Sequence, residues 1–354
     1  MALLRTGLMI LALIAVSGCA VAEEGSDTIA GVRVAPGERV DVSFDVPAGE
    51  TDAATFIPVT ILRGAADGPT ALMVAGVHGY EFAPMLAADR LAESLSLETM
   101  TGNFIIVRVA HIPAFEDRSV FVNPNDRKNL NRSFPGKVDG TQTERIAHVL
   151  STELIASADF VFDVHSGDGA EWLEPFVGAW GGPLATDYPT ALAAAKAIGF
   201  PNVVRYAMFT QEQIDNGRSL NRQAVAQGLP TILIEIGQNG SRDEAHVQRL
   251  VDGIKNALAS LGVLQNKVST FPQPRTFESS KAVKAGHSGF WYPTRRGGPV
   301  MQGEVIGEIR NYRGQVVEVL RSPIDGYGIY GQMGPPIRKG DSAMTIGVPA
   351  NIED

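Results

Sequence analysis

Short, continuous runs of apolar residues recur along the chain, and stretches with helical spacing separate them. A run without polar alternation indicates a strand that is buried on both faces. Such runs cover residues 60–63, 71–75, 104–109, 160–164 and 231–236, and helical spacing covers 82–95, 143–155, 189–198, 219–227 and 245–261. This alternation predicts an α/β fold with a mixed, mostly parallel sheet flanked by helices.

The pattern changes near residues 265–274, where Lys267, Pro272 and Pro274 interrupt it. Beyond this stretch the apolar runs are shorter and are separated by glycines, at 289–292, 305–309, 316–319 and 327–330. Short strands with closely spaced turns are typical of a small all-β unit. We therefore predict a larger domain over residues 23–268 and a small β barrel-like domain over residues 275–354.

The first residues have the pattern of an export signal. Arg5 precedes an apolar run over residues 8–16, which is shorter than the about 20 residues that a membrane span needs. Small residues precede Cys19, as in the lipobox of bacterial lipoproteins, where the thiol is lipidated. The signal would then cover residues 1–18 and be cleaved just before Cys19. Cleavage after Ala22 is the alternative. We expect a periplasmic protein, which a lipid on Cys19 would attach to the membrane.

Composition narrows the class of partner. The chain has 354 residues, 44% hydrophobic and 19% charged, which is typical of a folded globular protein. Its net charge of −9 argues against a nucleic-acid partner, because phosphate binding needs a basic surface. Cys19 is the single cysteine, so no disulfide within the chain can form. A small-molecule partner is the better expectation.

Two histidines follow or end predicted strands. His78 lies just after the run at 71–75, with Glu81 three residues later, and His165 ends the run at 160–164. Taken alone, each is better explained without a metal: most His-x-x-Glu pairs are coincidental surface groups, and a histidine that ends a strand usually finds its hydrogen bonds within the protein. Together they form the set of two histidines and one glutamate, with an open fourth position, that is typical of catalytic zinc. Asp163 shares a strand face with His165 and could fix its imidazole.

A carboxylate also interrupts the apolar run at 231–236. Glu235 is costly there unless it is paired or functional, and a buried ion pair is the alternative interpretation. Beside a zinc-activated water, Glu235 would act as a general base and pass the proton to a leaving nitrogen.

The loop at residues 123–136 is dense in polar groups and contains Arg127, Asn131 and Arg132. An arginine beside an asparagine amide is suited to holding a carboxylate. Taken alone, the segment could equally be a hydrated turn.

Four segments in this order resemble the succinylglutamate desuccinylase/aspartoacylase family, a branch of the zinc carboxypeptidase superfamily. They are Gly-x-His-Gly-x-Glu, Asn-Leu-Asn-Arg, Asp-x-His-Ser-Gly and Ile-Glu-Ile-Gly. The resemblance covers residue 60 to the C-terminus and implies a zinc carboxypeptidase-like fold. It implies one zinc ion per chain, with His78, Glu81 and His165 as its ligands. Glu235 would be the catalytic carboxylate.

The same resemblance implies roles for the polar loop. Asn131 and Arg132 would clamp a carboxylate of the substrate. Arg127 would polarise the scissile carbonyl, although it lies only four residues before Asn131.

The C-terminal part resembles a lipoyl or biotinyl barrel, but its turn at residues 311–314 has no lysine to carry a cofactor. In some relatives this domain lends side chains to the active site, and Tyr292 and Tyr312 are the candidates here.

The resemblance implies a zinc-dependent hydrolase of an amide C–N bond. Its substrate would be an N-acyl amino acid or a related N-acylated small amine with a carboxylate. An exported zinc carboxypeptidase that acts on short or cell-wall peptides is one alternative. A catalytically inactive, ligand-binding lipoprotein is another.

Overall fold

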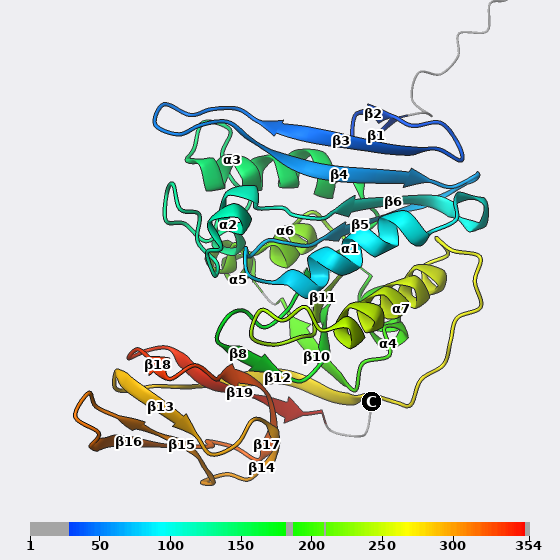
Figure 1. Cartoon of the computed structure of the whole chain (residues 1–354). Coiled ribbons are helices and arrows are strands. Elements are labelled where there is room, and N and C mark those ends of the chain that lie inside the picture. The colour runs from blue at the N-terminus through cyan, green and yellow to red at the C-terminus, as the bar shows by residue number, and fades with distance from the viewer. Residues whose placement is uncertain (1–27, 182–186, 209, 351–354) are drawn as a thin grey trace, which may run out of the picture.

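The computed structural model describes residues 28–181, 187–208 and 210–350, and a large twisted sheet runs through it (Figure 1). The predicted signal and Cys19 lie outside these residues. The strands of this sheet follow the order β14-β17-β19-β12-β10-β9-β11-β7-β5-β6-β4-β3, and β8 pairs with β17. Their bounds are β3 (Arg39–Val46), β4 (Thr55–Arg63), β5 (Ala66–Val74), β6 (Thr101–Val107), β7 (Phe160–His165), β8 (Glu171–Leu173), β9 (Phe176–Gly181), β10 (Asn202–Ala207), β11 (Thr231–Glu235), β12 (Arg275–Lys284), β14 (Gly298–Val300), β17 (Gly326–Gln332) and β19 (Ser342–Pro349).

Two smaller sheets and the helices complete the described part of the chain. One antiparallel sheet has the order β16-β15-β13-β18, and β1 pairs with β2. These strands are β1 (Thr28–Ile29), β2 (Val32–Arg33), β13 (Gly289–Pro293), β15 (Val305–Arg310), β16 (Val316–Arg321) and β18 (Pro336–Ile337). The helices are α1 (Phe82–Ser94), α2 (Ile112–Asp117), α3 (Gln142–Val149), α4 (Tyr188–Ala197), α5 (Gln211–Gly217), α6 (Leu220–Ala226) and α7 (Glu244–Ser260), with shorter turns η1 (Leu97–Thr99), η2 (Leu130–Arg132), η3 (Leu150–Leu154) and η4 (Ile155–Ser157).

The centre of the large sheet confirms the predicted fold class. Parallel pairing joins β6, β5, β7 and β11 in sequence, and it also joins β9, β10 and β12. The pair β9–β11 is antiparallel, as are the outer pairs β6–β4 and β4–β3. The carboxyl ends of β5, β7 and β11 therefore lie side by side at one edge of the sheet.

Strand alternation divides the interior into two cores. Along β5, Ala71 and Met73 pack with α1, α4 and α7, whereas Leu72 and Val74 pack with α3 and α6 on the other face. Because both faces of the central strands are covered, their sequences are continuously apolar. The helices of the two layers are seen on either side of the sheet in Figure 1.

The structure extends or divides several predicted elements. The strand expected from residue 60 begins at Thr55, and the helix expected over residues 143–155 is α3 followed by the turns η3 and η4. The strands β9 and β10 were not predicted. Gly178 and Gly181 weaken the apolar pattern of β9, although all of its residues are buried.

The C-terminal region is β-rich, as predicted, and its own strands pair antiparallel, but the large sheet continues into it. Residues 265–274 contain no helix or strand, and β12 follows directly. Strand β12 pairs in parallel with β10 and antiparallel with β19. A small core of Phe176, Val204, Phe277 and Ile329 lies across this junction.

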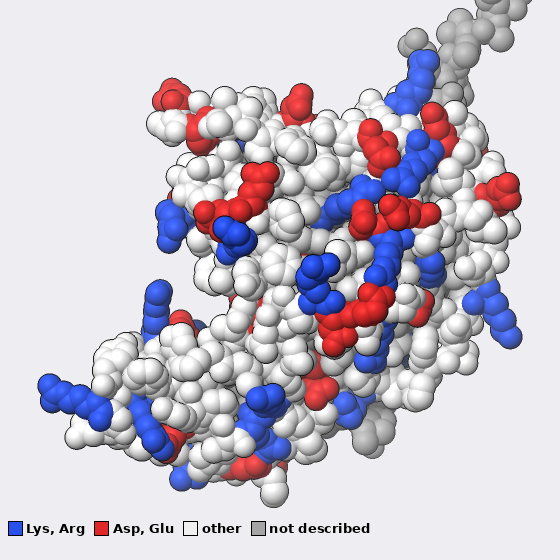
Figure 2. Space-filling view, in the orientation of Figure 1, with Lys and Arg blue, Asp and Glu red and all other residues white. Residues whose placement is uncertain are grey.

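On the face shown in Figure 2, acidic and basic side chains are interspersed, and a hollow separates the C-terminal lobe from the rest of the molecule. Within the described ranges, no helix is both long enough and apolar enough to cross a membrane.

Candidate active site

Three predicted metal ligands come together at the edge of the sheet. His78 lies in the loop after β5, Glu81 directly precedes α1, and His165 is the last residue of β7. Since β5 and β7 are adjacent and parallel, their carboxyl ends bring the three side chains to one point. One ligand atom from each residue lies within 4.8 Å of the others.

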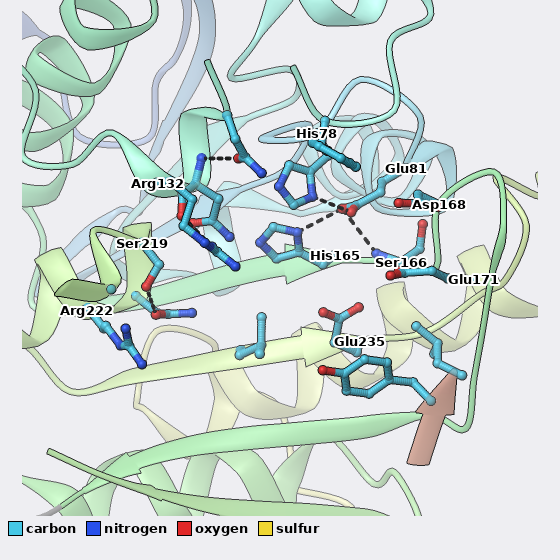
Figure 3. Close-up of a pocket in the computed structure, with 18 of the residues that line it drawn as sticks. His78, Glu81, Arg132, His165, Ser166, Asp168, Glu171, Ser219, Arg222 and Glu235 are labelled. Carbon is cyan, nitrogen blue, oxygen red and sulfur yellow. Dashed lines mark hydrogen bonds and ion pairs between the residues drawn. The ribbon is translucent and has the colours of Figure 1, made fainter. Parts of the chain in front are cut away.

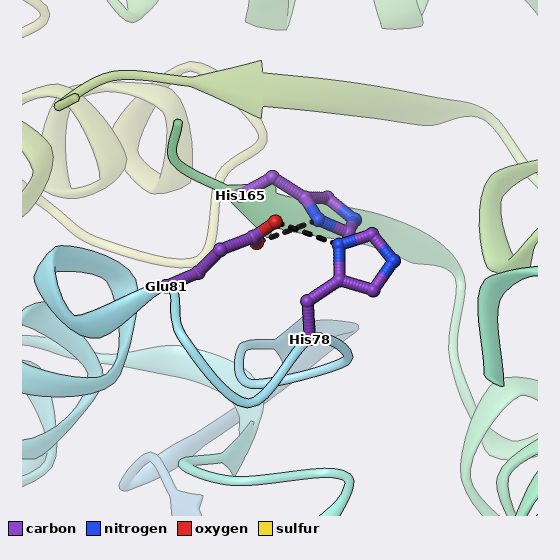
Figure 4. Close-up of side chains that lie close together, drawn as sticks. All are labelled: His78, Glu81 and His165. Atoms are coloured by element: carbon purple, nitrogen blue, oxygen red, sulfur yellow. Dashed lines mark hydrogen bonds and ion pairs between the residues drawn. The ribbon is translucent and has the colours of Figure 1, made fainter. Parts of the chain in front are cut away.

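The two imidazoles point at one carboxylate (Figure 4). His78 Nδ1 lies 2.6 Å from Glu81 Oε1, and His165 Nδ1 lies 2.8 Å from Glu81 Oε2. The backbone amide of Ser166 donates to Glu81 Oε2 at 3.3 Å. Glu81 and His165 are buried, and His78 is partly exposed.

His165 is also held from its other side. Its Nε2 lies 2.8 Å from Asp163 Oδ1, as the shared strand face predicted. Asn221 Nδ2 donates to Asp163 Oδ2 at 3.0 Å, so the carboxylate is itself fixed. A metal-ligating histidine commonly has such a carboxylate on its second nitrogen.

The electrostatic environment of His78, Glu81 and His165 favours a bound cation. Burial alone would raise the pKa of Glu81, but the charges of His165 and His78 outweigh it and lower the pKa to about 2. Burial opposes a charge on His165 as well, yet Asp163 and Glu81 raise its pKa well above the usual value. A divalent metal can replace the protons that the imidazoles would otherwise carry. The donor set and its burial therefore fit a zinc-type ion.

Glu235 faces this cluster from the neighbouring strand. It ends β11 and lies opposite His165 in the parallel register of β11 and β7. Burial raises the pKa of its carboxyl well above the usual value, and the charges of Glu81 and Glu171 add to this, while His165 opposes it. Glu235 thus lies beside the candidate metal site with a strong affinity for a proton.

A cavity of about 640 Å³ opens at these residues (Figure 3). It is lined by His78, Glu81, Phe121, Asn129, Asn131, Arg132, His165, Ser166, Asp168, Glu171, Leu173, Phe176, Trp180, Tyr206, Asn216, Gly217, Ser219, Asn221, Arg222, Leu233, Glu235, Ser280 and Tyr330.

The charges of the cavity are separated. Arg132 and Arg222 lie on one side of the candidate metal ligands in Figure 3, and Asp168 and Glu171 lie on the other. Glu235 is between them. The cavity therefore offers a cationic end and an acidic end on either side of the reactive centre.

The cationic end has two N–H groups without a hydrogen-bond partner. Arg222 Nε and Trp180 Nε1 are both buried and unpaired, and the Arg222 guanidinium lies 5.7 Å from the centre of the Trp180 ring. Burial and the charge of Arg132 lower the pKa of Arg222. Unpaired buried donors in a cavity wall are suited to an acceptor on a ligand.

Arg222, Trp180, Asp168 and Glu171 were not predicted from the sequence. The two acids follow His165 within six residues, so the sequence held a signal for them. No local pattern marks Arg222 or Trp180, because α6 and β9 meet only in the folded chain.

The predicted polar loop is only partly in the cavity wall. Asn131 and Arg132 line the cavity, and Asn131 Oδ1 accepts from the amide of Leu220 at 2.9 Å. That bond uses the carbonyl of Asn131 to hold the start of α6. Arg127 is exposed and does not line the cavity, so the structure does not bring it to the position predicted for it.

The two candidate tyrosines, Tyr292 and Tyr312, do not line this cavity. Both are exposed, at 46% and 78%, because Tyr292 lies on the outer face of β13 and Tyr312 in the turn after β15. The C-terminal region instead contributes Ser280 of β12 and Tyr330 of β17 to the cavity.

Comparison with known proteins accounts for this arrangement. The family pattern of the succinylglutamate desuccinylase/aspartoacylase catalytic domain matches residues 67–261, which is more than half of the chain. The chain belongs to this family. The match includes His78, Glu81, His165 and Glu235.

Relatives of the family are similar over most of the chain. N-alpha-acetyl-L-2,4-diaminobutyric acid deacetylase of Halomonas elongata is 32% identical over 261 residues, which cover 72% of this chain and 74% of that protein. The product-bound ectoine utilization protein EutE (DoeB) of Ruegeria pomeroyi has a TM-score of 0.79 at 27% identity, covering 90% of this chain and 97% of that one. A succinylglutamate desuccinylase from a Silicibacter species has a TM-score of 0.79 at 26% identity, covering 90% and 97%.

Proposed function

We propose that this chain is a zinc-dependent deacylase that hydrolyses the amide bond of an N-acylated amino acid. The observation that carries the proposal is the buried His78, Glu81 and His165 cluster with Glu235 beside it, in a cavity whose far wall holds two arginines. The family supports it, since the similar Halomonas protein is a deacetylase of an N-acetylated amino acid.

His78, Glu81 and His165 would hold the metal, with Asp163 fixing the orientation of His165. A zinc ion there would polarise the scissile carbonyl and acidify a water molecule beside it. The rest of the reaction depends on the side chains of the chain itself.

Glu235 moves the proton. In its ionised form the carboxylate takes a proton from the attacking water, and its raised pKa makes it a strong base for this step. The same carboxyl then donates that proton to the nitrogen as the C–N bond breaks. The raised pKa keeps the proton on Glu235 until the nitrogen accepts it.

Arg132 and Arg222 would bind the carboxylate of the substrate. Guanidinium groups match a carboxylate in geometry and charge, and Trp180 Nε1 adds an unpaired donor at the same end. This contact would hold the amide against the metal cluster in a single orientation.

The substitution Glu235→Gln tests the mechanism. It keeps the volume of the side chain but removes the proton acceptor, so we expect kcat on N-acetyl amino acids to fall by about 10²-fold or more while zinc content stays near one per chain. Steady-state kinetics with metal analysis of the same sample measure both. A variant with zinc bound and wild-type kcat would exclude Glu235 as the base.

A screen of N-acetyl, N-succinyl and N-formyl amino acids, with short peptides beside them, tests the reaction class. Hydrolysis of peptides alone would favour the zinc carboxypeptidase alternative.

A further inference from the structure

The acidic end of the cavity has no part in the proposed hydrolysis. Asp168 and Glu171 line it, and neither belongs to the cluster of candidate metal ligands. They lie on the opposite side of that cluster from Arg132 and Arg222 (Figure 3).

The backbone holds both residues firmly. Asp168 Oδ1 accepts from the amide of Ala170 at 3.1 Å, and the amide of Glu171 donates to the carbonyl of Asp168 at 3.3 Å. The Glu171 carbonyl accepts from Asn239 at 2.9 Å, which ties this loop to the one after β11. Glu171 also begins β8, where it lies opposite Gln332 of β17. The position of the acidic end is therefore set by two strands and a turn.

The cations near these carboxylates in the described part of the chain do not balance them: the charge of His78 lowers the pKa of Asp168 and that of His165 lowers the pKa of Glu171, but burial outweighs both. Over residues 28–181, 187–208 and 210–350, no lysine, arginine or histidine forms an ion pair with Asp168 or Glu171. Burial, with the charges of Asp168 and Glu81, raises the pKa of Glu171 to about 8, and burial also raises the pKa of Asp168. Two unbalanced carboxylates in the wall of a cavity cost free energy unless a ligand supplies positive charge.

We propose that Asp168 and Glu171 bind a positively charged amino group of the substrate. This rests on the proposed function and narrows its substrate class to molecules with an ammonium group in addition to the carboxylate. The carboxylate lies against Arg132 and Arg222, and the ammonium group lies against Glu171 and Asp168. The scissile amide is then held between them, at the metal cluster. A bound ammonium group also lowers the pKa of both acids, because it favours their charged forms.

The ammonium group can belong to either half of the substrate. It can lie on the amino acid, as in an N-acetylated diamino acid, or on the acyl group, as in a dipeptide. Both present the same chemistry to Glu171, and two test substrates distinguish them.

The test compares three substrates that differ in this group. Nα-acetyl-2,4-diaminobutyrate has the ammonium group on the amine half, glycyl-2-aminobutyrate has it on the acyl half, and Nα-acetyl-2-aminobutyrate lacks it. We expect the zinc-loaded protein to prefer one of the charged substrates over the neutral one by about tenfold or more in kcat/KM. In Glu171→Gln this preference should fall by about the same factor.

A binding readout separates recognition from turnover. If the amine half carries the charge, calorimetry should show that the product 2,4-diaminobutyrate binds more tightly than 2-aminobutyrate. If the acyl half carries it, glycinamide should bind more tightly than acetamide. In Glu171→Gln this difference in affinity should be lost. If that variant fails to fold, Asp168→Asn serves instead, because its amide oxygen can still accept from Ala170.

The control is Glu174→Gln, which removes a nearby carboxylate that does not line the cavity, and it should keep the wild-type preference. Equal kcat/KM for charged and neutral substrates, or an unchanged preference in Glu171→Gln, overturns the acidic subsite and leaves the deacylase proposal intact. Hydrolysis of none of the N-acylated substrates overturns the deacylase proposal itself.

Discussion

Arg222 and Arg127 show how differently two arginines of one chain can be placed. Arg222 lines the cavity with an unpaired, buried Nε, whereas Arg127 is exposed on a loop outside it. A charged hydrogen bond to a substrate carboxylate contributes about 1.5–3 kcal/mol, so its loss is large only where the contact is made.

We therefore expect Arg222→Met to lower kcat/KM on N-acetyl amino acids by about 10- to 100-fold, mainly through KM. Arg127→Ala should change it by less than about threefold. Steady-state kinetics of the two variants at matched zinc content measure this difference. A large loss in Arg127→Ala with none in Arg222→Met would restore the role that the sequence predicted for Arg127.

His111 is buried, and its environment disfavours the charged form. Burial, with the nearby charge of His78, lowers its pKa to about 4, and its Nε2 has no hydrogen-bond partner. Because the folded protein binds this proton less well than the unfolded chain, the stabilisation is complete above pH 6.5 and is lost as the pH falls towards 4.

Over that range the free energy of unfolding should fall by about 3 kcal/mol on account of His111. His111→Asn keeps a donor near the carbonyl of Val77, which Nδ1 approaches at 3.3 Å, and it does not titrate. Urea unfolding of both proteins between pH 7 and pH 4 should give a shallower decline for the variant. Parallel curves would show that His111 is not the group that titrates.

The residues that the sequence could predict are those next to a recognisable strand. His78, His165 and Glu235 lie at or just after the ends of apolar runs, and Glu81 lies at the start of the helix that follows one of them, so the parallel-sheet pattern together with the family resemblance placed all four at one edge. Arg222 could not be placed in this way, since its contact with Trp180 joins segments whose local sequence indicates no common site.

At the scale of elements, the loop between β5 and α1 depends on close packing against α2. The amide of His111 donates to the carbonyl of Gly76 at 3.0 Å, and a Cβ added at Gly79 would overlap with the carbonyl of Ala114. The position of the candidate metal ligands His78 and Glu81 is thus set by how near α2 can come to this loop.

Gly79→Ala should push the loop and α2 apart, destabilise the protein by about 1–3 kcal/mol and reduce its zinc content. Thermal unfolding and metal analysis measure the two effects. The comparison variant is Gly303→Ala, where φ is 83° but no atom lies within 4 Å of the added Cβ. It should lose some stability and keep its zinc, and equal zinc content in both variants would contradict the argument.

The elements that escaped sequence analysis have a common physical feature. Glycines interrupt the run of apolar side chains in β9, and most residues of β12 are not fully buried. Neither strand therefore forms a continuous apolar run in the sequence. Their place in the sheet comes from pairing with distant strands, which local periodicity does not record.

At the scale of the whole molecule, the sheet joins the two parts that the sequence divided at residue 275. The junction core of Phe176, Val204, Phe277 and Ile329 draws its members from both parts. Shared strand pairing and a shared core couple their unfolding.

We expect calorimetry to show a single unfolding transition, and Phe277→Ala to shift it as a whole by about 3–5 kcal/mol of destabilisation. Circular dichroism at a helix wavelength should give the same midpoint. Two separate transitions, with Phe277→Ala moving only one, would show that the parts unfold independently.

The pairing of β8 with β17 also has a consequence for the order in which the protein matures. The candidate metal ligands and Glu235 are all made by residue 235, but the partner of the strand that begins with Glu171 is not made until residues 326–332. During synthesis, which runs from the N-terminus, the candidate metal ligands and Glu235 are thus in the chain well before the strand that pairs with β8. A chain interrupted before residue 326 would contain the candidate metal ligands and Glu235 but would lack β17, which pairs with β8 and supplies Ile329 to the junction core, so the cavity wall around those groups would be incomplete.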